Sequence, residues 1–219
     1  MATVLITGAN RGIGLEIASQ YEARGDEVVA VCRRSCEALD TMGVEVIDGV
    51  DVTSDESVAD MASALSGRRI DRLVNNAGIL ERDGLDDLDF GVIERQFRVN
   101  ALGPLRVTAA LRPLLTDGAK VFIVTSRMGS IEDNSSGGYY GYRMSKAAVN
   151  IAAKSLSVDL KDAGVGVFLL HPGYVATDMT GGQGIPAEQA AAGLIERMDT
   201  LQLEQTGTFW HQEGYALPW

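Results

Sequence analysis

The chain has 219 residues, of which 46% are hydrophobic and 22% are charged, a composition typical of a soluble globular protein. Its formal net charge of −11 argues against a nucleic-acid or anionic-membrane partner, because such surfaces repel an acidic protein. No apolar run approaches the roughly 20 residues that span a bilayer, and the first residues lack the pattern of a secretory signal. We therefore expect a cytoplasmic protein.

The residues that usually bind metals are few. Two cysteines, Cys32 and Cys36, and two histidines, His171 and His211, are all that the chain contains. A zinc site needs more such ligands at closer spacing, and a chain of this size does not need a disulfide framework. We expect reduced thiols and no metal.

Seven short apolar or β-branched runs predict seven strands. They cover residues 3–7, 27–31, 44–47, 71–76, 120–126, 165–170 and 207–210. Several are apolar nearly throughout, as strands buried on both faces of a parallel sheet are. Helical patterns lie between them, and this alternation predicts a single α/β domain over residues 1–219. Its fold is a doubly wound, seven-stranded parallel sheet flanked by helices on both faces.

The helices between these strands carry recognisable boundaries. The first helical pattern ends at Gly25, a common stop residue. Thr53 and Glu56 form a T-x-x-E capping box that should open a later helix. The stretch 91–117 is also helical in pattern, and Pro104 inside it should bend or break the helix.

A glycine-rich turn, "TGANRGIG", directly follows the first strand. Gly8 allows a sharp turn, Gly12 lets the backbone approach a pyrophosphate, and Gly14 permits close packing of helix on strand. The N-terminus of the helix then offers free N–H groups and a positive dipole to an anion. Glycines also make ordinary tight turns, but their place between a strand and a helix favours dinucleotide binding.

The end of the second strand reads "VCRR" and includes Cys32, Arg33 and Arg34. NAD-binding proteins usually carry an acid there, about 20 residues beyond the glycine turn. A guanidinium matches a phosphate instead, and Arg11 in the glycine turn can supply a second cation. Surface arginines need no such role, but the missing acid predicts NADPH/NADP⁺ rather than NADH as the cofactor.

The stretch "GGYYGYRMSK" holds three tyrosines and one lysine. On a helix, residues four apart share a face, and only Tyr142 has a lysine, Lys146, at that offset. Tyr139 and Tyr140 should pack or line a cleft. The Y-x-x-x-K spacing also arises by chance, so by itself it does not identify a catalyst.

Together, the motifs resemble one family. "TGANRGIG", "NNAG" at 75–78, Asn100, Ser126, "YRMSK" and "HPG" at 171–173 occur in the order typical of short-chain dehydrogenases/reductases. The segments "SRMGSIEDNSSGGYYGYRMSKAA" and "GTFWHQEGYALPW" resemble its C-factor and sniffer-type carbonyl reductase branch more narrowly. The resemblance covers the whole chain. It implies a Rossmann fold and a nicotinamide cofactor used to interconvert carbonyls and alcohols.

The resemblance assigns catalytic roles to four residues. Tyr142 is the expected general acid/base, and Lys146 should lower its pKa and hold the nicotinamide ribose. Ser126 should donate to the carbonyl oxygen, with Thr125 as its neighbouring rival. Asn100 resembles the asparagine that positions a water behind the lysine. Alternatively, Asn100 is a helix residue satisfied by backbone.

The resemblance also assigns a set of cofactor contacts. The expected contacts are Gly8, Asn10, Arg11, Gly12, Ile13, Gly14, Arg33, Asp51, Val52, Asn76, Ala77, Gly78, Tyr142, Lys146, Pro172, Gly173, Val175 and Thr177. Asn76 alternatively supports the central strands, and Asp51 alternatively starts the next helix. We expect His171 to be satisfied by backbone rather than catalytic.

Two features depart from the common family pattern. Ser126 and Tyr142 are sixteen residues apart, so the intervening loop should be longer than usual. The segment 177–186 is short where many relatives carry extra helices over the substrate. It contains three glycines, which lose much conformational entropy on ordering. We expect a mobile lid, an open cleft and broad specificity.

The sequence therefore predicts an NADPH-dependent carbonyl reductase, reversible as an alcohol dehydrogenase, that acts on bulky ketones or aldehydes. A 3-oxoacyl-thioester reductase and a C-factor-like cofactor-binding signalling protein remain alternatives. The expected partner is a small carbonyl or alcohol substrate. The family resemblance also suggests a homodimer through the helices at 91–116 and 140–163.

Overall fold

The computed structural model describes residues 1–219. All seven strands pair in parallel within one sheet, in the order β3-β2-β1-β4-β5-β6-β7. The strands are β1 (Thr3–Thr7), β2 (Glu27–Val31), β3 (Glu45–Ile47), β4 (Arg72–Asn75), β5 (Lys120–Val124), β6 (Gly166–His171) and β7 (Phe209–His211). The predicted fold is confirmed.

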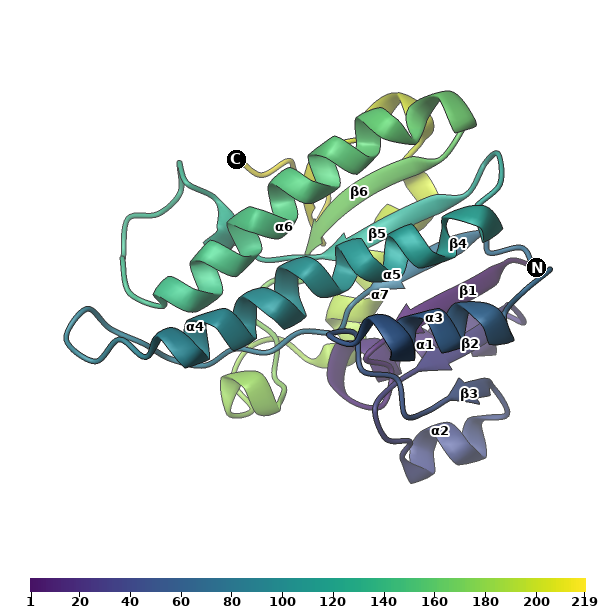
Figure 1. The fold of residues 1–219 in the computed structure, drawn as a ribbon, viewed down its shortest axis with the longest axis horizontal. Coiled ribbons are helices and arrows are strands. Elements are labelled where there is room, and N and C mark those ends of the chain that lie inside the picture. The colour runs from purple at the N-terminus through teal and green to yellow at the C-terminus, as the bar shows by residue number, and fades with distance from the viewer.

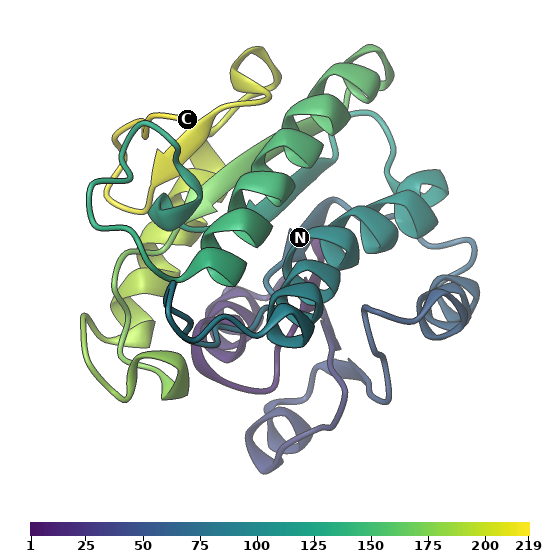
Figure 2. The same ribbon diagram turned by 60° about the vertical axis from the view of Figure 1, so that its left-hand side comes forward.

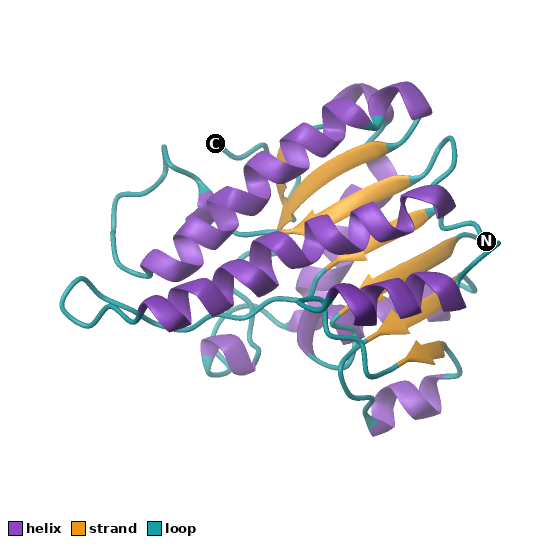
Figure 3. Cartoon of the chain, viewed as in Figure 1, coloured by secondary structure: helices purple, strands orange, loops and turns teal.

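Helices cover both faces of the sheet (Figure 1, Figure 3). They are α1 (Gly12–Ala23), α2 (Glu37–Met42), α3 (Asp55–Ala64), α4 (Phe90–Phe97), α5 (Gly103–Leu111), α6 (Tyr140–Asp159) and α7 (Ala187–Thr200). Helices α3, α5 and α6 share one core cluster with the sheet, whereas α1, α2 and α7 share the other. None of the helices is both long and apolar enough to cross a membrane.

The alternation of side chains along each strand builds the two cores. Leu5 and Val29 face the cluster beneath α3, α5 and α6, whereas their neighbours Val4 and Val28 face the cluster beneath α1 and α7. Successive residues of a strand point to opposite faces, and here both faces are buried. This explains why the strand sequences are apolar almost throughout.

The strand order reverses between β1 and β4. The chain starts at the centre of the sheet, runs outward to β3, returns to β4 and then runs outward to β7 (Figure 1). Ligands of open α/β sheets bind at such a switch point, in the crevice outside the carboxyl ends of the strands.

One local prediction needs correction. Helix α3 is capped by Ser54, whose hydroxyl accepts a hydrogen bond from the Ser57 amide, so the predicted Thr53 capping box is wrong. Thr53 instead donates its amide and hydroxyl to the Asp51 carboxylate, both at 2.8 Å. The expected helix at 91–117 is divided by a π-helical turn over residues 98–102, and Pro104 stands at the start of α5.

Candidate active site

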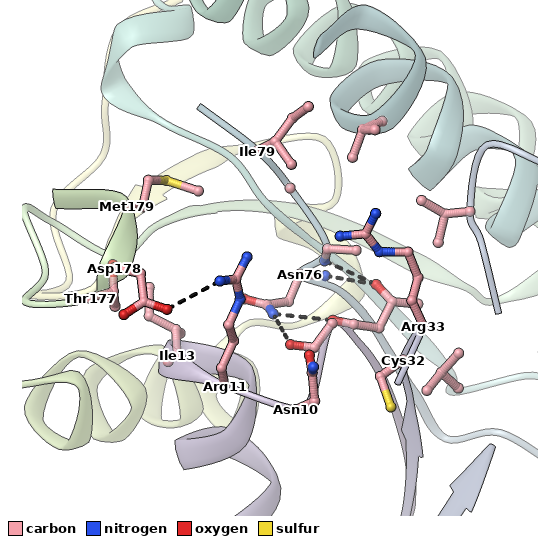
Figure 4. Close-up of a pocket in the computed structure, with 18 of the residues that line it drawn as sticks. Asn10, Arg11, Ile13, Cys32, Arg33, Asn76, Ile79, Thr177, Asp178 and Met179 are labelled. Atoms are coloured by element: carbon pink, nitrogen blue, oxygen red, sulfur yellow. Dashed lines mark hydrogen bonds and ion pairs between the residues drawn. The ribbon is translucent and has the colours of Figure 1, made fainter. Parts of the chain in front are cut away.

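A cavity of about 1040 Å³ lies at the carboxyl ends of β1, β2 and β4. The predicted cofactor positions that line it are Gly8, Asn10, Arg11, Gly12, Ile13, Arg33, Asp51, Val52, Asn76, Ala77, Gly78 and Thr177. Figure 4 shows side chains from the glycine turn, the end of β2 and the segment after β6 converging on it. Gly14, Tyr142, Lys146, Pro172, Gly173 and Val175 do not line this cavity. Sequence reasoning missed Ile79, Leu80, Glu81, Asp178 and Met179, which line it beside the predicted positions.

The glycine turn has the geometry that its sequence predicts. Gly8 and Gly12 have φ values of +68° and +54°, in the left-handed region that favours glycine. A Cβ on Gly14 would lie 2.3 Å from the Gly8 carbonyl oxygen and 2.5 Å from Asn76 Nδ2. The first turn of α1 can therefore lie against β1 only because no side chain stands at Gly14.

Asn76 ties this turn to β4. Its Nδ2 donates to the carbonyl oxygens of Thr7 and Gly8, both at 3.1 Å. Its own amide donates to Thr7 Oγ1, also at 3.1 Å. Asn76 thus holds the two central strands and the glycine turn together at the switch point.

Cationic side chains lie along the cavity. Arg33 lines it and forms no ion pair with a carboxylate. Arg11 Nη1 lies 3.1 Å from Asp178 Oδ2, and both side chains are largely exposed (Figure 4). Asn10 Nδ2 donates to the Arg34 carbonyl at 3.0 Å, which ties the glycine turn to the end of β2.

Asp51 closes the turn before α3. Hydrogen bonds from Thr53 and, to a smaller extent, the charge of Arg33 lower the pKa of its carboxyl group, while burial opposes this shift. Asp51 therefore holds Thr53 in the turn before α3, and it also lines the cavity.

Tyr142 and Lys146 occupy one face of α6, as their spacing predicts. Both are buried, with exposed fractions of 7% and 5%. Lys146 Nζ lies 5.7 Å from the centroid of the Tyr142 ring and donates to the Val124 carbonyl at 3.0 Å. That hydrogen bond fixes the ammonium at the carboxyl end of β5.

The hydroxyl groups of Ser126 and Thr125, at the end of β5, have different hydrogen-bond partners. Thr125 Oγ1 lies 2.7 Å from Asn150 Oδ1 within α6, so it is used in packing. Ser126 Oγ accepts from the Met128 amide at 3.1 Å and stands next to the Tyr142 phenol. Of the two candidates, Ser126 is the one beside Tyr142.

Burial has the largest influence on the pKa values of Tyr142 and Lys146. It raises the pKa of Tyr142 to about 12, and the Ser126 hydroxyl opposes the shift. It lowers the pKa of Lys146 to about 8. The net direction for Tyr142 is thus upward, set by removal from water, and the expected lowering of its pKa by Lys146 stays a prediction.

Asn100 lies fully buried in the π-helical turn. Its side chain exchanges two hydrogen bonds of 2.8 Å with the backbone of Ile79, and Nδ2 also lies 3.0 Å from Ser145 Oγ. The alternative that Asn100 is satisfied by protein groups thus accounts for its contacts. A Cβ on Gly78 would lie 3.2 Å from Asn100 Oδ1 and 3.8 Å from Lys146 Nζ, so Gly78, which lines the cavity, lies close to both side chains.

The segment after β6 contains the remaining predicted cofactor contacts. Gly173 has a φ of +85°, and Val175 pairs with Ile185 through an isolated bridge. Thr177 and Thr180 cap the short 3₁₀ turn of residues 178–180 reciprocally. The segment 177–186 therefore has internal hydrogen bonds, and its mobility stays a prediction.

His171 differs from expectation. Its ring forms no hydrogen bond, and Nδ1 is buried without a partner. The ring packs edge-on against His211 with centroids 5.2 Å apart. Burial, followed by the His211 charge, lowers the pKa of His171 to about 3. The expectation of a backbone-satisfied histidine is wrong, and the residue packs as a neutral ring.

Comparison with known proteins agrees with this geometry. The sequence profile of the short chain dehydrogenase family matches residues 2–186. The chain is 48% identical over 226 residues to a 1-hydroxy-2-glutathionyl-2-methyl-3-butene dehydrogenase of a Rhodococcus species, with all of both chains covered. It is 47% identical over 154 residues to the C-signal protein of Myxococcus xanthus, covering 68% of this chain and 93% of that one.

Solved structures agree as well. The NADPH-bound carbonyl reductase from chicken fatty liver superposes with a TM-score of 0.92 at 27% identity, covering 100% of this chain and 99% of that one. The carbonyl reductase Sniffer of Drosophila melanogaster superposes with a TM-score of 0.89 at 28% identity, covering 100% of both. The family match and the parallel sheet thus agree, and the chain belongs to the short-chain dehydrogenase family of oxidoreductases.

Proposed function

We propose that this protein is an NADPH-dependent carbonyl reductase, reversible as an alcohol dehydrogenase, that acts on ketones or aldehydes. The observation that carries the proposal is the buried corner at the carboxyl end of β5. There a phenol, a hydroxyl and an ammonium come together next to a cavity suited to a dinucleotide.

The cavity suits a nicotinamide dinucleotide for two reasons. The glycine turn leaves backbone room where a Cβ on Gly8 would lie 2.9 Å from Ala77 Cα. The helix N-terminus behind that turn favours a pyrophosphate. When bound, the cofactor supplies the hydride that a carbonyl carbon accepts.

Tyr142 supplies the proton. With a pKa raised to about 12, the phenol is protonated at neutral pH, which is the form that reduction of a carbonyl requires. Ser126 is placed beside it to donate a hydrogen bond to the same oxygen and to stabilise the charge that develops there. In the oxidative direction the phenol must first lose its proton, so alcohol oxidation should increase with pH.

Lys146 keeps a positive charge beside the phenol. Its pKa of about 8 leaves it mostly protonated at pH 7, and one of its three N–H groups is taken by the Val124 carbonyl. The remaining N–H groups can hold ribose hydroxyls, as the family resemblance implies. Asn100 fixes the Ile79 backbone, and Ile79 lines the cavity.

Preference for NADPH is supported by the cation at the end of β2. Arg33 lines the cavity and forms no ion pair with a carboxylate, and the residues that directly follow β2 are Cys32, Arg33 and Arg34, with no acid among them. The Arg33 guanidinium is free to pair with a 2′-phosphate. The chicken carbonyl reductase, which shares the fold, is an NADPH-bound structure.

The substrate class is supported by the cleft and by the relatives. Met179 and Tyr140 are partly exposed, at 42% and 36%, and can offer apolar contacts to a bulky ketone or aldehyde. A second candidate substrate is an alcohol that carries a glutathionyl group. It is favoured by the 48% identity, over the whole chain, to a dehydrogenase named for such an alcohol.

The test is a substrate panel followed by NADPH absorbance. It compares ketones of increasing size in the reductive direction with a glutathionyl alcohol and NADP⁺ in the oxidative direction. Tyr142→Phe should abolish turnover while NADPH still binds, because only the proton donor is lost. Tyr139→Phe and Tyr140→Phe are the matched controls and should retain most activity. Near-normal turnover in Tyr142→Phe would refute the assignment.

A further inference from the structure

Helix α6 begins without a cap from its own sequence. Its N-cap residue is Tyr139, whose side chain makes no capping hydrogen bond. Tyr139 is also the only non-glycine residue with a positive φ, at 51°. The residues that usually cap helices are Ser, Thr, Asp and Asn, and without one the first amides lack an acceptor. Because Tyr142 is the third residue of this helix, its position depends on how that first turn is held.

Asp83 supplies the missing acceptor from a distant part of the chain. Its Oδ2 accepts from the Gly141 amide at 2.8 Å, across 58 residues of sequence. Its backbone carbonyl accepts from the Tyr139 amide at 3.0 Å. The side chain is buried, with 9% exposed. A carboxylate in this place gains both from the charge-assisted hydrogen bond and from the positive end of the helix dipole.

The packing around Gly141 leaves no room for a side chain at that position. A Cβ on Gly141 would lie 2.5 Å from Gln96 Nε2 and 3.0 Å from Asp83 Oδ2. Gln96 is fully buried in α4, and its Oε1 accepts from the Glu81 amide at 3.0 Å. The first turn of α6 is thus seated on a loop that α4 also holds.

The same loop continues from the cofactor cavity. Residues 76–81 line that cavity, and Asp83 follows two residues later. Figure 1 and Figure 2 show this segment passing from the end of β4 to the start of α6. One stretch of chain therefore contacts the dinucleotide cavity at one end and caps the catalytic helix at the other.

We propose that Asp83 is a positioning residue for the reaction: its carboxylate fixes the first turn of α6 and thereby sets the Tyr142 phenol against Ser126. The inference rests on the proposed function, because it concerns the same phenol. Asp83 itself does not touch the reacting atoms. It acts through the Gly141 amide, one residue before Tyr142.

The experiment compares Asp83→Ala and Asp83→Asn with wild type. Asp86→Ala is the matched control, an exposed carboxylate of the same loop. Asp83→Ala should lower kcat by about 10-fold to 100-fold, the cost of a catalytic group displaced by about 1 Å. The KM for the carbonyl substrate and the Kd for NADPH should stay near their wild-type values. Asp83→Asn keeps an acceptor oxygen without the charge, so its kcat should lie between those of Asp83→Ala and wild type. The kcat of Asp86→Ala should match that of wild type.

Hydrogen exchange of the Gly141 amide gives a readout that needs no turnover. Exchange should become faster in the order wild type, Asp83→Asn, Asp83→Ala. An unchanged exchange rate, or a wild-type kcat in a folded Asp83→Ala, overturns the proposal. So does a loss of activity that only follows the fraction of protein still able to bind NADPH, because that outcome indicates a purely structural role.

Two further outcomes are possible: the Asp83→Ala variant does not fold, or the wild type shows no turnover. If Asp83→Ala does not fold, Asp83→Asn decides: a lower kcat at unchanged NADPH affinity supports the proposal, and a wild-type kcat overturns it. If wild type shows no turnover with any carbonyl or alcohol, the proposed function fails. The Gly141 exchange rates then still decide whether Asp83 holds the helix.

Discussion

Replacing Lys146 with methionine should stabilise the protein and abolish its turnover. Lys146 is 5% exposed, pairs with no carboxylate and has the Val124 carbonyl as its hydrogen-bond partner. Burial lowers its pKa from 10.5 to about 8. The folded protein therefore binds this proton less tightly than the unfolded chain does, and it loses stability by carrying the charge.

The size of the effect follows from the two pKa values. A fall from 10.5 to about 8, at about 1.4 kcal/mol per pH unit, corresponds to about 3 kcal/mol. Below pH 8 both states are protonated and the full penalty applies. Between pH 8 and 10.5 the folded protein releases the proton and the penalty shrinks. Methionine has a similar unbranched shape, and losing the hydrogen bond to Val124 offsets about 1 kcal/mol, which leaves a net gain of about 2 kcal/mol at pH 7.

Thermal and chemical unfolding of the protein without cofactor, at pH 7 and pH 10, would measure this. For a domain of this size, about 2 kcal/mol corresponds to a rise in Tm of about 4–8 °C, and the advantage of Lys146→Met should shrink at pH 10. Lys154→Met is the matched control, since Lys154 is exposed on the same helix and donates to the Gly207 carbonyl at 3.2 Å. A Lys146→Met variant less stable than wild type at pH 7 would refute the reasoning.

Arg33→Asp should lower the preference for NADPH over NADH by at least about tenfold, because a hydrogen bond to a charged group contributes about 1.5–3 kcal/mol; steady-state kinetics with both cofactors measures it, and a wild type that favours NADH would contradict it. Gly14→Ala should cost about 1–3 kcal/mol in chemical unfolding, since its Cβ would lie 2.3 Å from the Gly8 carbonyl oxygen, and wild-type stability would show that the turn can relax. We also propose a homodimer through α4, α5 and α6. Its apolar surface includes Ile151, 65% exposed, so Ile151→Asp should convert dimers to monomers in light scattering, and a monomeric wild type at micromolar concentration would count against it.

The strands and the glycine turn could be predicted from sequence because their causes are local. The runs at 3–7 and 27–31 match β1 and β2 residue for residue, since buried parallel strands are apolar on both faces. The positive φ of Gly8 follows from a sharp turn between a strand and a helix. The Tyr142–Lys146 spacing likewise depends only on helical geometry.

What could not be predicted depends on contacts between distant segments. The Asp83 cap joins residues 58 apart, and nothing near Asp83 in the sequence marks it as the partner of α6. The raised pKa of Tyr142 comes from burial under the assembled fold, whereas sequence spacing reveals only the neighbouring lysine. At α3, Thr53 and Ser54 are adjacent hydroxyl residues, and the Asp51 carboxylate engages Thr53 and leaves Ser54 to cap the helix.

The π-helical turn between α4 and α5 limits how this chain can change in length. Residues 98–102 hold Asn100 against the Ile79 backbone, and each residue of an α-helix advances the chain by about 100°. Deleting one residue here would let a regular helix run through, at a gain in helical hydrogen bonding. It would also remove the wide turn that presents Asn100 to the Ile79 backbone, whereas a deletion within α4 or α5 would rotate one helix relative to the other by that angle and break the packing of α5 on the sheet. This turn should therefore tolerate substitution better than insertion or deletion.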